Sequence, residues 1–253
     1  MDKSKNSIKP GTIWKLDEHR LAFGDCRDKE LLKRLIGKEK INLLCCDIPY
    51  GISVVESKRG FSKLSKDKVI ENDHLQSDSE YRAFNREWLE AIKPFLAKKN
   101  SFYVFNADKM VWSLRDAMIE SGFKVAQLLI WIKSQAVVGR LDYAPAHELI
   151  LFWWLGTHIF RHSKDRSVLF HPRPTKSKLH PTMKPLGLIR RLVLNSSSVG
   201  DLVYDGFLGS GTTLLVCEQT KRICIGIELD EEYCLTAVSR WEKLTNRKAE
   251  IYV

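Results

Sequence analysis

The sequence predicts an α/β domain built on a largely parallel β-sheet. Three observations indicate this class: short apolar runs alternate with segments of helical spacing, one apolar run ends in an aspartate, and a glycine-rich loop joins another run to a helix. Strands that alternate with helices form parallel sheets, because each helix returns the chain to the same edge. The 253 residues, 44% of them hydrophobic, can bury one such core, so we expect a single domain over residues 1–253.

The first half of the chain shows both kinds of element. Leu31 and Leu35 share one helix face, and Ser77 and Glu80 have the spacing of a capping box that starts a helix. The long polar stretch 51–78 before that helix is either a functional loop or disordered. The expected elements are two short strands within 12–25, a helix over 27–36, a strand over 41–46, a helix up to 92, a strand over 101–105 and a helix over 108–121.

The second half continues the alternation after one irregular stretch. Residues 156–179 are polar and basic and have no clear period, whereas Pro185 suits the first turn of a helix. The expected elements are strands over 125–132 and 149–154, a helix over 185–195, a strand over 202–204, a glycine loop over 206–211, a helix over 212–219, a strand over 222–227 and a helix over 230–244.

Composition narrows the class of protein. Forty-one lysines and arginines against 31 acids give a formal charge of +10, which a polyanionic partner would explain. The six cysteines form no C-x-x-C pair, so we expect buried, reduced thiols and no metal site. The sequence has neither a signal peptide nor a run of about 18 apolar residues, so we expect a soluble, cytoplasmic protein without a membrane span.

A glycine loop marks a candidate cofactor site. Residues 205–213 read D-G-F-L-G-S-G-T-T between a strand and a helix, and glycines there let the backbone approach a ligand closely. The loop lacks the lysine of a Walker A motif and the spacing of a dinucleotide fingerprint. Glu228 ends the next strand, where an acid commonly accepts hydrogen bonds from ribose hydroxyls. The pair indicates a nucleoside-type cofactor without a pyrophosphate, against the alternative of an ordinary turn.

Two further motifs carry polar groups suited to chemistry. Asp47-Ile48-Pro49-Tyr50 follows an apolar strand, so that a carboxylate and the Ile48 carbonyl can accept the two N–H groups of an exocyclic amine while Tyr50 stacks on its base. His-Pro-Thr-Met-Lys-Pro over 180–185 places a hydroxyl and a cation before a helix, an arrangement that suits a carboxylate. A simple turn and a proline-bounded loop are the alternatives.

Together these motifs resemble those of the DNA amino-methyltransferases. Residues 47–50 resemble the Asp-Pro-Pro-Tyr catalytic motif of that family, residues 180–185 its H-P-T-x-K-P element, and residues 205–213 its D-P-F-x-G-S-G-T-T loop. The order, with the catalytic motif first, is that of the circularly permuted β class. Gly24-Asp25, His147-Glu148 and Glu228 match further family elements. Ile48 and Gly206 depart from the family, which usually has proline at both positions.

The resemblance implies a fold, a cofactor and a set of binding residues. The fold is a Rossmann-like methyltransferase domain, doubly wound, with a mainly parallel sheet and an antiparallel edge, and the cofactor is S-adenosyl-L-methionine. Asp25 would contact the adenine of the cofactor and Glu228 its ribose, while the glycine loop would cradle the methionine end. The implied cofactor residues are Asp25, Thr182, Lys184, Asp205, Phe207, Gly209, Ser210, Gly211, Thr212, Thr213 and Glu228.

The resemblance also implies the reaction. The catalytic residues would be Asp47, Ile48, Pro49 and Tyr50, and the product N6-methyladenine in a base flipped out of double-stranded DNA. The family tends to use aspartate at the first motif position for adenine and serine for cytosine. An N4-cytosine or RNA methyltransferase, and a nucleic-acid-binding module with a vestigial cofactor pocket, are the alternatives.

Two charge-rich segments are candidates for DNA contacts. Residues 51–78 and 156–179 are expected to flank strands whose carboxyl ends point to the site, and so to form one basic face. Recognition would use these segments or the partner in a homodimer, in a prokaryotic or phage-encoded, nucleoid-associated enzyme such as that of a restriction-modification system. The candidate DNA-binding residues are Lys58, Arg59, Arg161, Lys164, Arg166 and Arg173.

Overall fold

The computed structural model describes residues 8–51, 76–136, 142–162, 165–172 and 183–252. The strands of this part of the chain are β1 (Ile13–Leu16), β2 (His19–Phe23), β3 (Ile41–Asp47), β4 (Leu96–Asn106), β5 (Lys124–Ile132), β6 (His147–Trp154), β7 (Val168–Phe170), β8 (Leu202–Asp205), β9 (Ile223–Glu228) and β10 (Glu250–Tyr252). The helices are α1 (Lys29–Ile36), α3 (Asp78–Ile92), the 3-10 turn η1 (Lys93–Phe95), α4 (Val111–Glu120), α5 (Leu186–Ser196), α6 (Thr212–Thr220) and α7 (Glu231–Thr245).

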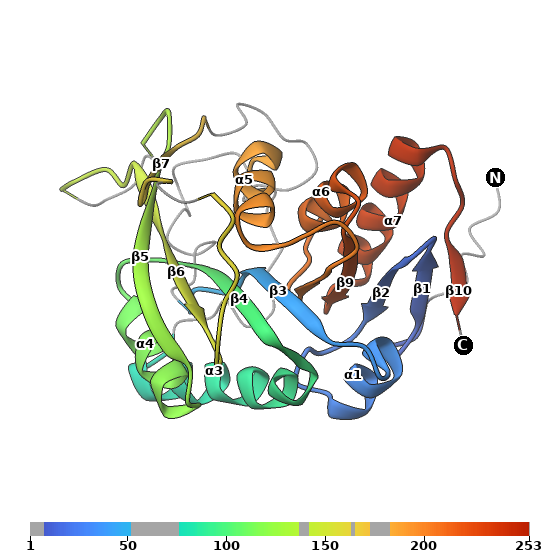
Figure 1. Cartoon of the computed structure of the whole chain (residues 1–253), viewed down its shortest axis with the longest axis horizontal. Coiled ribbons are helices and arrows are strands. Elements are labelled where there is room, and N and C mark those ends of the chain that lie inside the picture. Colours follow the sequence, from blue (N-terminus) through green and yellow to red (C-terminus); the bar gives the residue numbers. More distant parts are fainter. Residues whose placement is uncertain (1–7, 52–75, 137–141, 163–164, 173–182, 253) are drawn as a thin grey trace.

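One mixed sheet runs through the molecule in the order β10-β1-β2-β9-β8-β3-β4-β6-β5-β7 (Figure 1). Strands β2, β9, β8, β3 and β4 are parallel neighbours, whereas β1 and β10 on one side and β6 on the other pair antiparallel. Helices α1, α3 and α4 cover one face and α5, α6 and α7 the other. The predicted doubly wound, mainly parallel sheet with antiparallel edges is confirmed.

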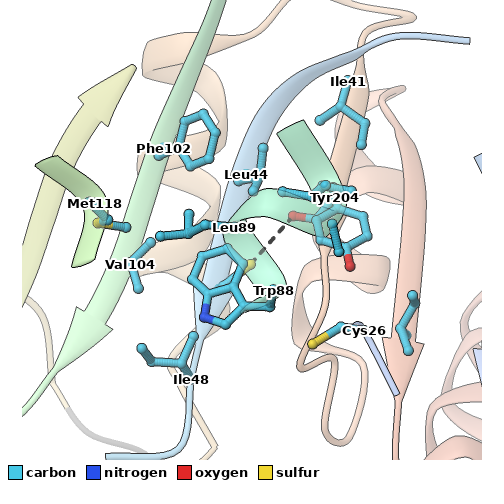
Figure 2. Packing of buried hydrophobic residues seen from close by; sticks show 14 of the residues in the cluster. Cys26, Ile41, Leu44, Ile48, Trp88, Leu89, Phe102, Val104, Met118 and Tyr204 are labelled. Atoms are coloured by element: carbon cyan, nitrogen blue, oxygen red, sulfur yellow. Dashed lines mark hydrogen bonds between the residues drawn. The ribbon is translucent and has the colours of Figure 1, made fainter. Parts of the chain in front are cut away.

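The core consists of two apolar layers, one on each face of the sheet. Figure 2 shows the layer beneath α3, where Trp88 and Leu89 pack with Phe102 and Val104 of β4. Trp88 is 1% exposed and Leu89 fully buried, and burial of each such side chain stabilises the fold by about 1.5–3 kcal/mol. The layer therefore holds α3 against the strand that ends at the candidate site.

Local signals in the sequence account for most element boundaries. The capping box of Ser77 and Glu80 is present at the start of α3, and Pro94 lies in the 3-10 turn that follows this helix. All six cysteines are buried and unpaired, as expected. Two strands were not predicted: β7 lies inside the polar stretch 156–179, and β10 contains only three residues. Both are short edge strands, whose pairing depends on a neighbour far away in the sequence.

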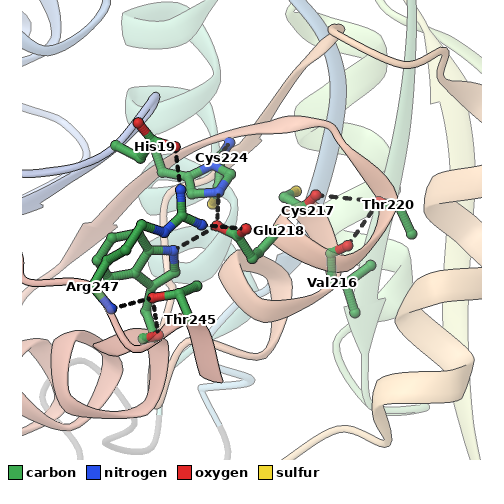
Figure 3. A network of polar contacts seen from close by, with 10 residues as sticks. His19, Val216, Cys217, Glu218, Thr220, Cys224, Thr245 and Arg247 are labelled. Carbon is green, nitrogen blue, oxygen red and sulfur yellow. Dashed lines mark hydrogen bonds and ion pairs between the residues drawn. The ribbon is translucent and has the colours of Figure 1, made fainter. Parts of the chain in front are cut away.

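A polar network secures the side of the sheet that carries β2 and β9 (Figure 3). Glu218 of α6 pairs with His19 of β2 at 3.1 Å and accepts from the indole of Trp241 at 2.8 Å. Burial lowers the pKa of His19, so its ring is neutral near pH 7. Its Nδ1 accepts from the backbone N–H of Cys224 at 2.9 Å, which leaves Nε2 to donate to Glu218. The network ties β2, β9, α6 and α7 together.

The described helices include none that is both long and apolar enough to cross a membrane.

Candidate active site

The carboxyl ends of the parallel strands bring polar residues to one edge of the sheet. Asp47 ends β3, Asp205 ends β8 and Glu228 ends β9. After β3 the chain continues to β4 on one side, whereas after β8 it continues to β9 on the other. Such a reversal of strand order opens a crevice where ligands bind in open α/β sheets. The three acids therefore surround the position at which this fold binds its ligands.

Asp47 is the acid of this group that is directed into an ionic cluster and still reaches solvent. Its Oδ1 accepts a hydrogen bond from the Tyr50 hydroxyl at 3.0 Å, and its Oδ2 one from Lys184 Nζ at 2.5 Å. Thirty per cent of the Asp47 side chain is exposed, against 6% of the Lys184 side chain. A ligand can therefore reach the Asp47 carboxylate from solvent, whereas the Lys184 ammonium is buried.

A second carboxylate shares the same lysine. The edge of the sheet at which β3, β8 and β9 end is called the active edge below. Because β6 runs antiparallel to β4, the first residues of β6 lie at this edge. Glu148 Oε2 is 3.1 Å from Lys184 Nζ. The Tyr50 hydroxyl lies 3.0 Å from this oxygen as well. Lys133, which directly follows β5, pairs with the other oxygen, Glu148 Oε1, at 2.7 Å. Two carboxylates and two ammonium groups thus alternate along one chain of contacts.

The electrostatics of this cluster follow from burial and from the neighbouring charges. Desolvation raises the pKa of Asp47, the ammonium of Lys184 opposes that rise, and the charge of Glu148 adds to it. Burial acts in the same direction on Glu148, but Lys184 and Lys133 outweigh it and lower its pKa to about 2. The two carboxylates raise the pKa of Lys184 despite its burial. Glu148 and Lys184 are therefore charged at neutral pH.

Hydrogen bonds from α3 and β4 support the backbone of the predicted catalytic motif, residues 47–50. Tyr81 of α3 donates its hydroxyl hydrogen to the Pro49 carbonyl at 3.0 Å, and Asn106 Nδ2 donates to the Tyr81 hydroxyl at 2.7 Å. Gly51 has a φ of +64°, and a Cβ there would meet the Tyr81 ring at 3.0 Å. The Ile48 side chain, 2% exposed, packs into the core. The side chain that replaces the proline of the family therefore serves packing, and the role of the Ile48 carbonyl toward a target amine stays a prediction.

The glycine loop wraps around a buried acid. Asp205 Oδ2 accepts from the Thr213 hydroxyl at 2.6 Å, and Oδ1 from the backbone N–H of Phe207 at 3.1 Å. Burial raises the pKa of Asp205 to about 7, against these two hydrogen bonds. Gly211 has a φ of +85°, and a Cβ there would lie 2.8 Å from the Cβ of Ala237. The loop therefore packs against α7 and surrounds the buried side chain of Asp205.

Gly206 has a specific neighbour that explains the absence of proline. A Cβ at this position would lie 2.8 Å from the Tyr204 hydroxyl oxygen and 3.1 Å from the Cβ of Cys26. Real Cβ atoms keep a greater distance, so any larger residue would have to displace Tyr204. The glycine therefore fits the tyrosine two positions earlier in β8.

Glu228 lies next to the glycine loop, as predicted from its position at the end of β9. Its Oε2 accepts from the Gly209 N–H at 2.6 Å, and its Oε1 from the Asp230 N–H at 2.9 Å. Burial raises the pKa of this carboxyl, opposed by the two backbone donors. Each carboxylate oxygen can accept a further bond, because it has two lone pairs. The side chain therefore links the loop to the start of α7 and keeps capacity for a hydroxyl donor.

Asp25 lies beside Glu228, because the Gly24 N–H donates to the Glu228 carbonyl oxygen at 2.9 Å. Its carboxylate accepts from the guanidinium and the backbone N–H of Arg27, the latter at 2.8 Å. Burial acts to raise the pKa of Asp25, but these hydrogen bonds outweigh it and lower the pKa. Arg27 also pairs with Glu87 at 2.9 Å. The predicted adenine contact of Asp25 would thus come from a carboxylate already oriented by Arg27.

The other predicted cofactor residues differ in their surroundings. Phe207 packs edge-on against Phe84 and Trp88, with ring centroids 6.2 and 5.9 Å apart. Ser210 accepts from Arg240 of α7 through its hydroxyl at 3.0 Å. Thr212 is the first residue of α6, after Gly211 at the N-cap. These contacts fix the shape of the loop; their roles toward a cofactor stay predictions.

Several candidate residues lie outside the described residues: Lys58, Arg59, Lys164, Arg173 and Thr182. Lys184 is described, and its ammonium faces Asp47 and Glu148, so its contact with a cofactor carboxylate stays a prediction.

One expectation about the DNA face is wrong. The stretch 156–179 was expected to leave the sheet at its active edge, but β6 is antiparallel, so the stretch begins at the opposite edge. Arg161 lies there: its backbone N–H donates to the carbonyl of Asn195, near the end of α5, at 2.7 Å, and its guanidinium donates to Ser198. Arg166 precedes β7, which runs parallel to β5 toward the active edge. Among the described residues of the stretch, those of β7 therefore run toward the site.

Four residues of the site were not among the predicted ones: Glu148, Lys133, Asn106 and Tyr81. Asn106 and Lys133 have the same signal as Asp47, a polar side chain at or directly after the carboxyl end of an apolar strand. Glu148 was noted only as part of a family element. Tyr81 has no local signal, because a tyrosine in the first turn of an amphipathic helix is ordinarily a packing residue.

Comparisons with known proteins agree with this geometry. The sequence pattern of the DNA methylase family, which covers N6- and N4-methyltransferases, matches residues 41–169 and 157–239. The Type II methyltransferase M.HpaI of Haemophilus parainfluenzae is 27% identical over 234 residues, which cover 83% of this chain and 70% of that protein. The Type II methyltransferase M2.DpnII of Streptococcus pneumoniae is 27% identical over 224 residues, covering 81% and 83%.

Solved structures show the same fold. The complex of M1.HpyAVI with SAM superposes with a TM-score of 0.64 and 24% identity, covering 87% of this chain and 98% of that one. The cytosine-N4-specific PvuII DNA methyltransferase superposes with a TM-score of 0.67 and 20% identity, covering 89% of both chains. The predicted Rossmann-like methyltransferase fold is thereby confirmed.

Proposed function

Because this chain belongs to the DNA methylase family, we propose that it transfers a methyl group from S-adenosyl-L-methionine to N6 of an adenine in double-stranded DNA. The observation that carries the proposal is the position of Asp47, a partly exposed carboxylate at the switch point of the sheet, close to a glycine loop. Bacterial relatives named Type II methyltransferases support a restriction-modification setting and action in the cytoplasm of a prokaryotic cell.

The residues at the glycine loop fit this cofactor. Glu228 has acceptor capacity for ribose hydroxyls, and Gly211 brings bare backbone to the start of α6. The N-terminus of a helix favours a negative charge, which suits the carboxylate of the methionine part. Thr182 is proposed to complete the binding of that carboxylate, whereas the predicted contribution of Lys184 would require its ammonium to leave Asp47 and Glu148. The bound cofactor would supply an electrophilic methyl group on a sulfonium.

The chemistry asked of the protein is orientation and charge stabilisation. The amino group of adenine is a weak nucleophile, because its lone pair is delocalised into the ring. An Asp47 carboxylate and an Ile48 carbonyl that accept its two N–H groups would turn the lone pair toward the methyl group. The negative charge of Asp47 would stabilise the positive charge that develops on nitrogen as the amine takes up the methyl group. Tyr50 would stack on the flipped base.

The choice of adenine is tested by the product. The aspartate of the first motif position supports adenine, whereas the fold supports neither base, since a cytosine-N4 enzyme shares it. Unmethylated DNA incubated with the protein and methyl-labelled cofactor, then digested to nucleosides, is expected to yield labelled N6-methyldeoxyadenosine. Labelled N4-methyldeoxycytidine would overturn the base assignment and keep the reaction class. Label in RNA only would overturn the substrate class.

The vestigial binding module remains the second candidate, and a direct measurement separates it. The intact contacts of Asp47, Tyr50 and Glu228 disfavour it, because a site without function has no reason to keep them. Calorimetric titration with S-adenosyl-L-methionine is expected to show one binding site per chain. Absence of binding would favour the module.

DNA is proposed to approach the active edge. Gly51 and Pro172 both lie near this edge. The stretches 52–75 and 173–182, which contain candidate DNA-binding residues, follow them in the sequence. Lys58, Arg59 and Arg173 belong to these stretches, with Lys164 and Arg166 preceding β7. A second copy of the chain in a homodimer would add recognition surface on the same side.

A salt titration tests this placement with a matched control. Arg173→Ala is expected to weaken DNA binding and to reduce the slope of log affinity against log salt by about 0.9, the contribution of one neutralised phosphate. Arg161→Ala removes the same charge from the opposite edge and is expected to leave slope and affinity unchanged. Equal effects of the two variants would show that DNA binding is not confined to the active edge.

A further inference from the structure

We propose that Glu148 and Lys133 are positioning residues. They keep the Lys184 ammonium shared between Asp47 and Glu148, and thereby set how strongly Asp47 accepts a hydrogen bond from the target amine. The inference rests on the proposed role of Asp47; it adds Lys133 to the residues that serve the reaction and gives a role to Glu148, which was noted only as part of a family element. It does not depend on whether the base is adenine or cytosine.

The contacts form a single continuous path. Lys133 Nζ lies 2.7 Å from Glu148 Oε1, and Glu148 Oε2 lies 3.1 Å from Lys184 Nζ. The same ammonium lies 2.5 Å from Asp47 Oδ2. The side chains of Lys133 and Glu148 are 7% and 17% exposed, so solvent screens their interaction little. Lys133 directly follows β5, Glu148 lies in β6, Asp47 ends β3 and Lys184 lies in the turn before α5. The packing of these four parts of the chain therefore fixes the spacing of the charges.

Lys184 competes with the substrate for Asp47. The ammonium donates to Asp47 Oδ2, one of the two oxygens to which the target amine must donate. A lysine with Asp47 as its sole counterion would be held tightly there, since a buried cation needs a partner. Glu148 offers the second partner, and Lys133 in turn keeps Glu148 from drawing Lys184 away altogether. The balance leaves Asp47 oriented and still basic.

The charges around Asp47 make this balance measurable. The described groups that act on it are Lys184, Tyr50, Glu148 and, across the crevice, Asp205. The oxygens of Asp47 and Glu148 that share Lys184 lie less than about 6 Å apart, a range in which like charges raise each other's pKa. Loss of the negative charge of Glu148 would lower the pKa of Asp47, and loss of Lys133 would raise it.

Glu148→Gln is the first test, because it keeps the shape and removes the charge. Turnover on unmethylated DNA, at saturating DNA and cofactor, is expected to fall about tenfold as Lys184 settles on Asp47. The acid limb of the pH–rate profile, where Asp47 becomes protonated, is expected to move about one pH unit lower. Thermal unfolding and calorimetric cofactor binding show whether the variant is folded.

Lys133→Met is expected to move the acid limb the other way, to higher pH, because Glu148 then acts on Asp47 without its own counterion. The double variant should match Glu148→Gln, since Lys133 acts only through Glu148. A merely structural role would lower stability in both single variants without moving the limb in opposite directions. If Glu148→Gln does not fold, Glu148→Asp, which keeps the charge and retracts it, is expected to give a smaller shift in the same direction.

The inference is overturned if the acid limb shifts in the same direction in Glu148→Gln and Lys133→Met, or if it does not shift in the folded variants. The proposed function fails separately: turnover retained by Asp47→Ala would remove Asp47 from catalysis. An inactive Asp47→Ala together with wild-type profiles for the Glu148 and Lys133 variants would overturn the inference alone.

Discussion

Asp47→Ala is expected to reduce methyl transfer by about 100- to 1,000-fold or more, the usual cost of removing a preorganised electrostatic partner of the reacting group. The amine would lose the acceptor that orients it and the negative charge that stabilises its positive charge. The fold should tolerate the change, because Lys184 keeps Glu148 as its counterion at 3.1 Å. Cofactor affinity should stay close to that of the wild type, since the Asp205 and Glu228 contacts do not involve Asp47.

Single-turnover kinetics with labelled cofactor measure this loss without interference from product release. Asp47→Asn serves as the matched variant: it keeps a carbonyl oxygen toward the amine and loses the charge, so its rate is expected to lie between those of Asp47→Ala and the wild type. Near-normal turnover of Asp47→Ala, with the variant folded and cofactor bound, would show that the site has been assigned to the wrong residues.

Glu228→Ala is expected to weaken binding of S-adenosyl-L-methionine by about 1–3 kcal/mol, the cost of leaving a buried polar group without its partner. Two effects contribute: the ribose hydroxyls lose an acceptor, and the N–H groups of Gly209 and Asp230 lose theirs. Asp25→Ala should have an effect of similar size, because it also frees the guanidinium of Arg27 beside the proposed adenine position.

Calorimetry at fixed pH measures both affinities. Glu228→Gln separates the two effects, because its amide oxygen can still accept from one backbone N–H while the negative charge is lost. It is expected to bind the cofactor more tightly than Glu228→Ala and less tightly than the wild type. Unchanged affinity in Glu228→Ala and Asp25→Ala together would move the cofactor pocket away from the ends of β2 and β9.

The sequence by itself determined most of the elements and the three motifs, because each of these depends on neighbours in the chain. The capping box of Ser77 and Glu80 starts α3 through bonds three residues apart. The glycines of the loop over 205–213 indicate a close backbone approach wherever that loop lies. Asp47 and Glu228 were predicted from their positions at strand ends, since parallel strands present those ends at one edge.

The tertiary structure decided the direction of strands and the partners of charges. An apolar run has the same sequence pattern in a parallel and in an antiparallel strand. No local signal therefore showed that β6 starts at the active edge and ends at the opposite edge, with Arg161 beyond its end. The pairing of Lys184 with Asp47 joins residues 137 positions apart, and that of Glu148 with Lys184 joins a strand to the turn before α5. Burial in one crevice brings these ions together, and that burial exists only once the sheet has formed.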